Sequence, residues 1–135
     1  MLELQNIKKV FYPGTINEKV ALCDLNLKLE DGEFVTVIGG NGAGKSTMQN
    51  IISGVFRPDA GRVLLDGIDV TPLPEYKRAK YLGRVFQDPS MGTAADMQIE
   101  ENLALAYRRG KRRTLRAGIT KKEREEYKKL LTELD

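Results

Sequence analysis

The sequence contains no histidine and only one cysteine, Cys23. The absence of histidine excludes His-based metal sites and any nucleophile that a histidine activates. A single cysteine excludes an intrachain disulfide and suits a reducing compartment such as the cytosol. Cys23 falls within a strand-like pattern, so we expect it to be a small buried residue and not a reactive thiol.

Long apolar runs and a secretory leader are also missing. No apolar run approaches the roughly 18 residues of a membrane span, and no basic and apolar leader opens the sequence, so secretion is not expected. The chain has 135 residues, of which 41% are hydrophobic and 30% charged, which is typical of one small soluble globular domain. The net charge of +3 is only weak support for an anionic partner.

Glycine, by contrast, is concentrated in one stretch that fits the phosphate-loop pattern G-x-x-x-x-G-K-[ST]. Glycines lack the Cβ atoms that would prevent backbone N–H groups from turning inward together around a triphosphate. The N-terminus of a following helix would add its positive end, Lys45 would reach the β- and γ-phosphates, and Ser46 would ligate Mg²⁺. The predicted nucleotide-binding loop comprises Gly39, Gly40, Asn41, Gly42, Ala43, Gly44, Lys45, Ser46 and Thr47.

The residues on both sides of the loop favour this reading over a flexible glycine linker. Residues 33–38 form a β-branched apolar run, as in a buried strand. After the loop, apolar residues recur at helical spacing at Met48, Ile51, Ile52 and Val55. Strand, glycine loop and helix therefore occur in the order that a phosphate loop requires.

Further elements are expected before and after the loop. We predict strands over residues 2–12, 20–30, 62–65 and 82–86, and helices over 75–80 and 99–108. Thr120 and Glu123 form a capping box that opens a final helix. The apolar face of that helix would need a partner; it consists of Tyr127, Leu130, Leu131 and Leu134.

Taken together, the motifs resemble the N-terminal half of the nucleotide-binding subunit of ABC transporters. A phosphate loop alone also occurs in kinases, GTPases and helicases. Gln87, at the end of the strand predicted over 82–86, narrows the choice to the ABC family. The features that occur in the family's order are an opening sheet with Phe11, the phosphate loop, Ser53-Gly54, Gly61 to Gly67, Val85-Phe86-Gln87 and Ile99-Glu100-Glu101-Asn102-Leu103.

The resemblance implies an α/β P-loop NTPase core with an antiparallel β subdomain and the start of a helical subdomain. The corresponding parts are a β unit over 1–32, a nucleotide-binding core over 33–87 and the helical part over 88–135. Phe11 matches the aromatic residue that stacks on adenine, although Tyr12 or simple strand packing are alternatives. Gln87 matches the glutamine that contacts Mg²⁺ and the attacking water, so Lys45 and Gln87 are the expected catalytic residues.

Some family features differ or are missing. Gly40 stands where Pro or Ser is more usual, and Gln98 stands where Thr is usual. The signature motif, the Walker B acidic residues, the catalytic glutamate and the switch histidine of the family would all follow residue 135. On the resemblance, the chain by itself is therefore not expected to turn over ATP, and we expect weak nucleotide binding and self-association.

The implied partners are ATP, Mg²⁺, the membrane subunits of a permease and a second ATPase subunit, at the cytoplasmic face of the cell membrane. The loop over 88–97 and the basic segment after it resemble those of ATPases of bacterial uptake systems for aromatic or branched amino acids. The rival function is a soluble ABC protein that acts on ribosomes or DNA.

A basic segment mildly favours that rival. Because the segment contains no aromatic residue for base stacking, we expect it to be a solvated connection near anionic lipid and not a nucleic-acid site. Only Glu123 opposes its cationic residues, which are Arg108, Arg109, Lys111, Arg112, Arg113, Arg116, Lys121, Lys122 and Arg124.

Overall fold

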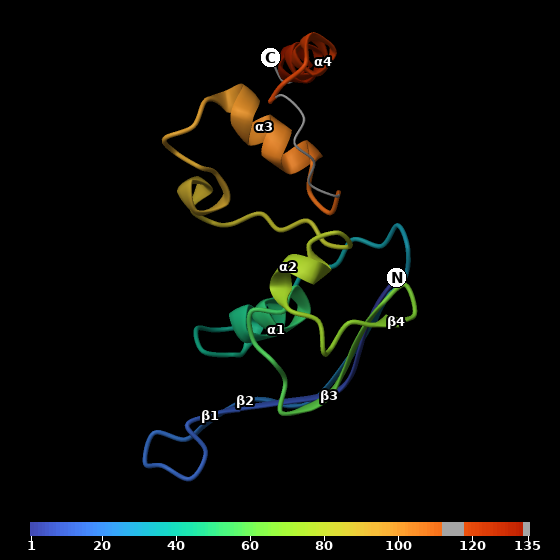
Figure 1. Cartoon of the computed structure of the whole chain (residues 1–135). Helices are drawn as coiled ribbons and strands as arrows, with labels where there is room; N and C mark the ends of the chain where they lie inside the picture. Colours follow the sequence, from blue (N-terminus) through green and yellow to red (C-terminus); the bar gives the residue numbers. More distant parts are fainter. Residues whose placement is uncertain (112–117, 134–135) are drawn as a thin grey trace. The chain divides into compact units, whose positions relative to one another are not determined.

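The computed structural model describes residues 1–111 and 118–133. The chain divides into two compact units, Met1–Leu82 and Gly83–Asp135 (Figure 1). The first unit contains every strand found among the described residues, as well as the phosphate loop. The second unit contains the described part of the predicted helical region. The predicted division near residue 87 stays a prediction.

A four-stranded antiparallel sheet forms the base of the first unit. The central strand β1 (Leu2–Phe11) pairs with β2 (Lys19–Leu29) on one side and with β3 (Ala60–Leu65) on the other. The short strand β4 (Ile68–Asp69) completes the order β2-β1-β3-β4. The strands predicted over 2–12, 20–30 and 62–65 are confirmed to within a residue or two. The pattern missed β4, because a two-residue strand after a turn carries no periodicity.

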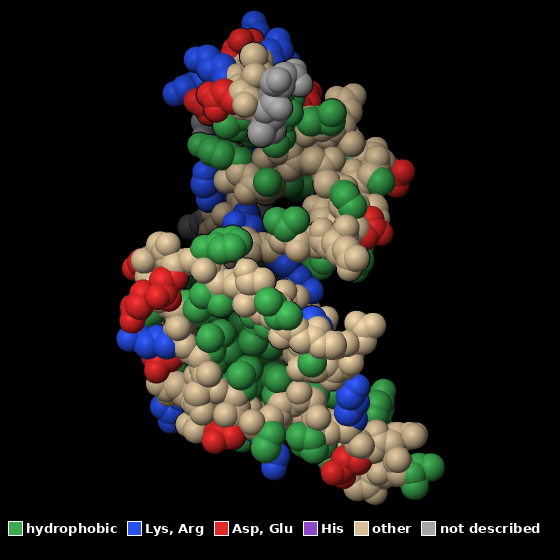
Figure 2. All heavy atoms as spheres, turned by 180° about the vertical axis from the view of Figure 1, so that it is seen from behind, with side chains coloured by type: hydrophobic (Ala, Val, Ile, Leu, Met, Phe, Trp, Pro, Cys, Tyr) green, Lys and Arg blue, Asp and Glu red, His purple; other side chains and the backbone are tan. Residues whose placement is uncertain are grey.

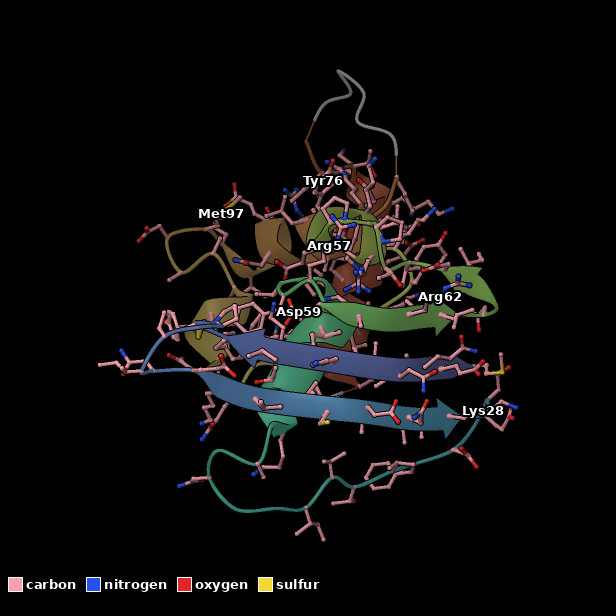
Figure 3. All side chains as sticks on the ribbon, turned by 90° about the horizontal axis from the view of Figure 1, so that it is seen from below. Lys28, Arg57, Asp59, Arg62, Tyr76 and Met97 are labelled. Carbon is pink, nitrogen blue, oxygen red and sulfur yellow. The ribbon has the colours of Figure 1, made fainter. Side chains whose placement is uncertain are left out.

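Helix α1 (Lys45–Ser53) packs on one face of this sheet (Figure 3). Its residues Met48 and Ile51 are buried, as predicted. The helix ends early because Gly54 caps it in the left-handed conformation at φ 89°, so Val55 lies beyond it and is 43% exposed. The short helix α2 (Glu75–Arg78) follows β4. The core consists of Leu4, Ile7, Leu22, Met48, Ile51, Val63, Leu65 and Val70.

Two predicted core strands are not formed. Residues 33–38 and 82–86 belong to no strand, and Phe34 is 94% exposed and Val85 97% exposed. An extended segment becomes a strand only when a neighbour accepts and donates its backbone hydrogen bonds. Among the residues that the structure describes, no segment pairs with either stretch. Hydrophobic side chains are accordingly visible on the surface of the first unit (Figure 2).

The prediction for Cys23 was wrong, because its side chain is exposed on β2. Successive residues of a strand point to opposite faces. Leu22 faces the core, so its neighbour Cys23 faces outward.

In the second unit, a 3-10 turn (Pro89–Gly92) precedes helices α3 (Ile99–Tyr107) and α4 (Lys121–Thr132), both of which were predicted. The capping box of α4 is formed, with the Glu123 N–H donating to Thr120 Oγ1 at 3.2 Å. The rings of Tyr107 and Tyr127 meet edge to face at 6.4 Å. On α4, Tyr127 is buried whereas Leu130 is 53% exposed, so much of the predicted apolar face is uncovered. Leu134 lies outside the described residues.

Candidate nucleotide-binding site

The phosphate loop owes its path to two glycines in the left-handed conformation. Gly42 has φ +83° and Gly44 has φ +86°, a region that other residues rarely adopt. Gly44 is also tightly packed, because a Cβ at this position would lie 2.6 Å from the Ala21 carbonyl oxygen of β2. The loop therefore leads from the unpaired segment 33–38 into α1 along a path that only glycine permits at Gly44.

The N-terminus of α1 has features that favour binding of an anion. Gly44 is the N-cap residue, no side chain caps the helix, and no acidic residue lies in its first turn. The first N–H groups of a helix have no partner within the helix, and the helix dipole makes this end positive. These groups belong to the residues that the motif assigns to phosphate, so their direction and charge suit a phosphate group.

The Lys45 ammonium lies over the loop that precedes it. Its Nζ donates hydrogen bonds to the carbonyl oxygens of Gly39 at 2.6 Å and Gly40 at 2.8 Å. A neutral carbonyl oxygen is a weaker partner for an ammonium than an anionic phosphate oxygen. A phosphate group placed in the loop can therefore take over one or both of these hydrogen bonds.

A cavity of about 260 Å³ joins the loop to the end of the first hairpin. The cavity brings Phe11 together with the predicted loop residues, although Gly39 and Gly40 do not line it. Tyr12 does not line it either, and its side chain is 69% exposed. The lining residues are Phe11, Lys19, Ala21, Asn41, Gly42, Ala43, Gly44, Lys45, Ser46 and Thr47.

Contacts with neighbouring side chains hold the Phe11 ring in place without a bound base. It contacts Phe56 edge to face with centroids 5.4 Å apart, and Lys9 Nζ lies 5.7 Å from its centroid. Strand packing and base stacking are thus compatible roles, because an edge contact leaves ring surface free for a base.

Magnesium would have few protein ligands here. Ser46 is exposed in the first turn of α1, where a hydroxyl could join phosphate oxygens around the ion. Within residues 1–111 and 118–133, no group of three or more His, Cys, Asp or Glu side chains could hold a metal. Gln87 is exposed and belongs to the second unit, so its contact with Mg²⁺ stays a prediction.

Arg78 is a structural residue that the sequence analysis missed. Its side chain is 1% exposed, and Nη1 donates to the carbonyl oxygens of Ile51 at 2.7 Å and Ile52 at 3.0 Å. Nε donates to Leu73 O at 2.8 Å and Nη2 to Thr71 O at 3.0 Å. Arg78 thereby caps the C-terminal end of the helix whose N-terminal end forms the site. No local pattern distinguishes it from the exposed cations beside it.

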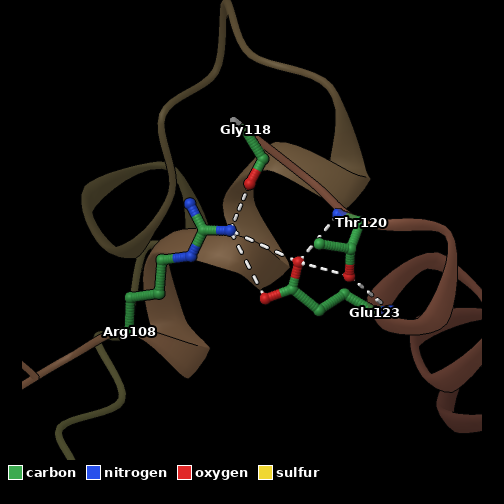
Figure 4. Close-up of polar contacts among 4 residues, drawn as sticks. All are labelled: Arg108, Gly118, Thr120 and Glu123. Carbon is green, nitrogen blue, oxygen red and sulfur yellow. Dashed lines mark hydrogen bonds and ion pairs between the residues drawn. The ribbon is translucent and has the colours of Figure 1, made fainter. Parts of the chain in front are cut away.

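In the second unit, cations of the basic segment make structural contacts. Arg108 donates to the Gly118 carbonyl and lies 3.4 Å from Glu123 (Figure 4). Arg124 donates to Glu100 at 2.7 and 3.0 Å, which lowers the pKa of that carboxyl. Lys111 lies over the Tyr107 ring at 3.5 Å. Arg112, Arg113 and Arg116 lie outside the described residues. Arg108 and Arg124 therefore link the α3 end of this unit to α4.

None of the helices formed by residues 1–111 and 118–133 has the length and hydropathy that a membrane crossing requires.

Comparison with known proteins points to one family. A profile of the ABC transporter family matches residues 22–135. A tyrosine transport ATP-binding protein of Clostridioides difficile is 47% identical over 116 residues, which cover 82% of this chain and 44% of that protein. A spermidine/putrescine import ATP-binding protein of Haemophilus influenzae is 38% identical over 108 residues, which cover 80% of this chain and 27% of that protein.

Solved structures agree with the sequence relatives. A dimeric bacterial ABC transporter cassette matches with a TM-score of 0.77 and 31% identity, over 98% of this chain and 56% of that one. A cassette in a post-hydrolysis state bound to ADP and Pi matches equally well, with a TM-score of 0.77. The chain thus spans about half the length, or less, of the proteins that it matches. The predicted P-loop ABC ATPase fold is confirmed, and this chain belongs to the ABC transporter family.

Proposed function

We propose that this chain binds MgATP at the phosphate loop, as the nucleotide-binding part of an ABC transporter ATPase. The observation that carries the proposal is the cavity that Phe11 and the loop share. Its two ends offer what ATP needs. An aromatic ring suits the base, while unpaired helix N–H groups and the Lys45 ammonium suit the phosphates.

The chain's own residues would act mainly by positioning. Phosphoryl transfer leaves little covalent chemistry for the protein, so charge stabilisation at the phosphates is its main contribution. Lys45 would hold the β- and γ-phosphates, and Ser46 would ligate Mg²⁺, which neutralises charge on the phosphates when bound. Gln87 would contact the ion and orient the attacking water.

Transport is the process that the relatives support. The proteins named above transport tyrosine or import polyamines, and the matched cassette is a dimer. We therefore propose that the protein works with permease subunits and a second ATPase subunit at the cytoplasmic face of the membrane. Import is favoured over export, and an amino acid is the preferred substrate class. The rival role on ribosomes or DNA has no support among these relatives.

The base site gives the first test. Stacking an aromatic ring on a base is worth about 1–3 kcal/mol and tolerates any base. We expect Phe11→Ala to lower MgATP affinity roughly five- to hundredfold, while GTP competes with ATP within about an order of magnitude. A fluorescent ATP analogue displaced by each nucleotide measures both effects.

Tyr12→Ala is the matched control, because Tyr12 neighbours Phe11 but does not line the cavity. Its affinity should equal that of the unmodified protein. Loss of binding in Tyr12→Ala with intact binding in Phe11→Ala would move the base site to Tyr12. Wild-type protein that neither binds the analogue nor shows displacement by ATP would contradict the proposed function.

A further inference from the structure

Lys19 lies at the nucleotide cavity although no part of the phosphate-loop motif includes it. It is the first residue of β2 and is the register partner of Phe11 on β1. Its side chain lines the cavity together with the loop residues. A Cβ on Gly42 would lie 3.4 Å from Lys19 Nζ, so the ammonium reaches the loop itself.

In the part of the chain that the structure describes, no carboxylate lies within ion-pair distance of the Lys19 ammonium. Two other lysines on the same sheet have carboxylate partners. Lys9 donates to Asp59 at 2.8 Å, and Lys28 pairs with Glu30 at 2.5 Å. The acidic neighbour Glu18 accepts a hydrogen bond from the Gly14 N–H at 2.6 Å. An ammonium on a cavity wall without a carboxylate partner is a ready site for an anion.

The position of Lys19 along the cavity indicates which part of a nucleotide it would meet. The base end is marked by Phe11, and the far phosphates are marked by Lys45 at the start of α1. Lys19 is paired with Phe11 between β1 and β2, and its Nζ lies close to Gly42 of the loop. In a bound nucleotide, Lys19 would therefore lie beside the phosphates that are nearest the ribose and the base.

We propose that Lys19 is a second phosphate-binding cation of this site, which contacts the phosphates nearest the ribose. This inference rests on the proposed MgATP function and adds a residue to it. The ligands it favours are nucleoside di- and triphosphates alike. Lys45, by contrast, contributes most to triphosphates, because it reaches the γ-phosphate.

The test compares Lys19→Met, which keeps an aliphatic stem without the charge, with Lys19→Arg, which keeps the charge. Lys8→Met is the control, since Lys8 is an exposed cation on β1 that does not line the cavity. Affinities for MgATP and MgADP are measured by calorimetry, and binding of adenosine by NMR titration. For a solvent-exposed cation, we expect Lys19→Met to lose about three- to tenfold in affinity for both MgATP and MgADP.

Lys19→Arg should bind within about twofold of the unmodified protein, and so should Lys8→Met. Adenosine, which has no phosphate, should bind Lys19→Met as well as it binds the unmodified protein, and a general structural defect would not give that result. The inference is overturned if Lys19→Met matches Lys8→Met, or if it weakens adenosine as much as MgADP. Failure of the proposed function looks different, because the unmodified protein would then bind neither MgATP nor MgADP.

Discussion

The buried cation Arg78 links the C-terminal end of α1 to the segment that precedes α2. Its guanidinium donates to four carbonyl oxygens, and burial lowers its pKa. Two of the oxygens, those of Ile51 and Ile52, belong to the last turn of α1, where carbonyl groups lack partners within the helix; the Ile51 oxygen also accepts the Gly54 N–H at 3.2 Å. Gly54 leaves room for the guanidinium, because a Cβ there would lie 2.8 Å from Arg78 Nε.

Arg78→Met should therefore destabilise the first unit strongly. The variant removes the four hydrogen bonds that the buried guanidinium donates to carbonyl oxygens, which we expect to lower the free energy of unfolding by at least about 2 kcal/mol. Urea denaturation followed by circular dichroism measures the change. Lys77→Met, at the exposed neighbouring position of α2, should change stability by no more than about 0.5 kcal/mol. Equal stability of the two variants would contradict the role given to Arg78.

The residues of the site differ in how far the sequence could predict them. Gly44 and Lys45 were predicted, because the motif itself specifies the backbone path and assigns a phosphate contact to the lysine. Lys19 reaches the cavity only through its pairing with Phe11, and Arg78 acts on carbonyls that are distant in sequence. Their functions depend on which segments meet in space, and single-chain patterns do not encode that.

Among the elements, the turn after α1 is held to the central strand by Asp59. Its carboxylate accepts hydrogen bonds from Lys9 Nζ at 2.8 Å and from the Val10 N–H at 2.7 Å. The hydrogen bond from Lys9, followed by that from Val10, lowers the pKa of Asp59 below its ordinary value. The ionised carboxylate thus stabilises the junction between the helix and the sheet.

This junction should be sensitive to acid. A carboxyl whose folded pKa is depressed contributes stability above its unfolded pKa of about 3.9, and loses it as the pH falls through the folded value. Asp59→Asn should therefore be less stable than the unmodified protein at pH 7, and the difference should shrink as the pH falls from about 5 towards 2. Urea denaturation across this range gives the comparison, with Asp96→Asn as a control in an exposed loop. A constant difference between pH 7 and pH 2 would show that the charge of Asp59 does not matter.

The sequence predicted best those elements whose hydrogen bonds lie within a single segment. Helix α4 was anticipated because its capping box and its backbone hydrogen bonds lie within the segment itself. The strand predicted over 33–38 is not formed, because a strand needs a neighbouring strand and no described segment pairs with these apolar residues. Its residues Phe34 and Ile38 are therefore 94% and 89% exposed.

For the molecule as a whole, the residues predicted for the nucleotide site fall in both units. Phe11, Lys19 and the phosphate loop all lie in Met1–Leu82, whereas Gln87 lies in Gly83–Asp135. On the proposed function, nucleotide binding depends on the first unit. The role proposed for Gln87 toward the attacking water would belong to the second unit.

The most direct test of the account is the affinity of the unmodified protein and of Lys45→Ala for MgATP, measured by isothermal titration calorimetry. Removal of the ammonium should eliminate a charge-assisted contact worth about 1.5–3 kcal/mol, which is roughly a ten- to hundredfold loss of affinity. Lys8→Ala, which removes an exposed cation outside the cavity, should bind as the unmodified protein does. Unchanged MgATP affinity in a folded Lys45→Ala protein would contradict the assignment of the phosphate loop as the nucleotide site.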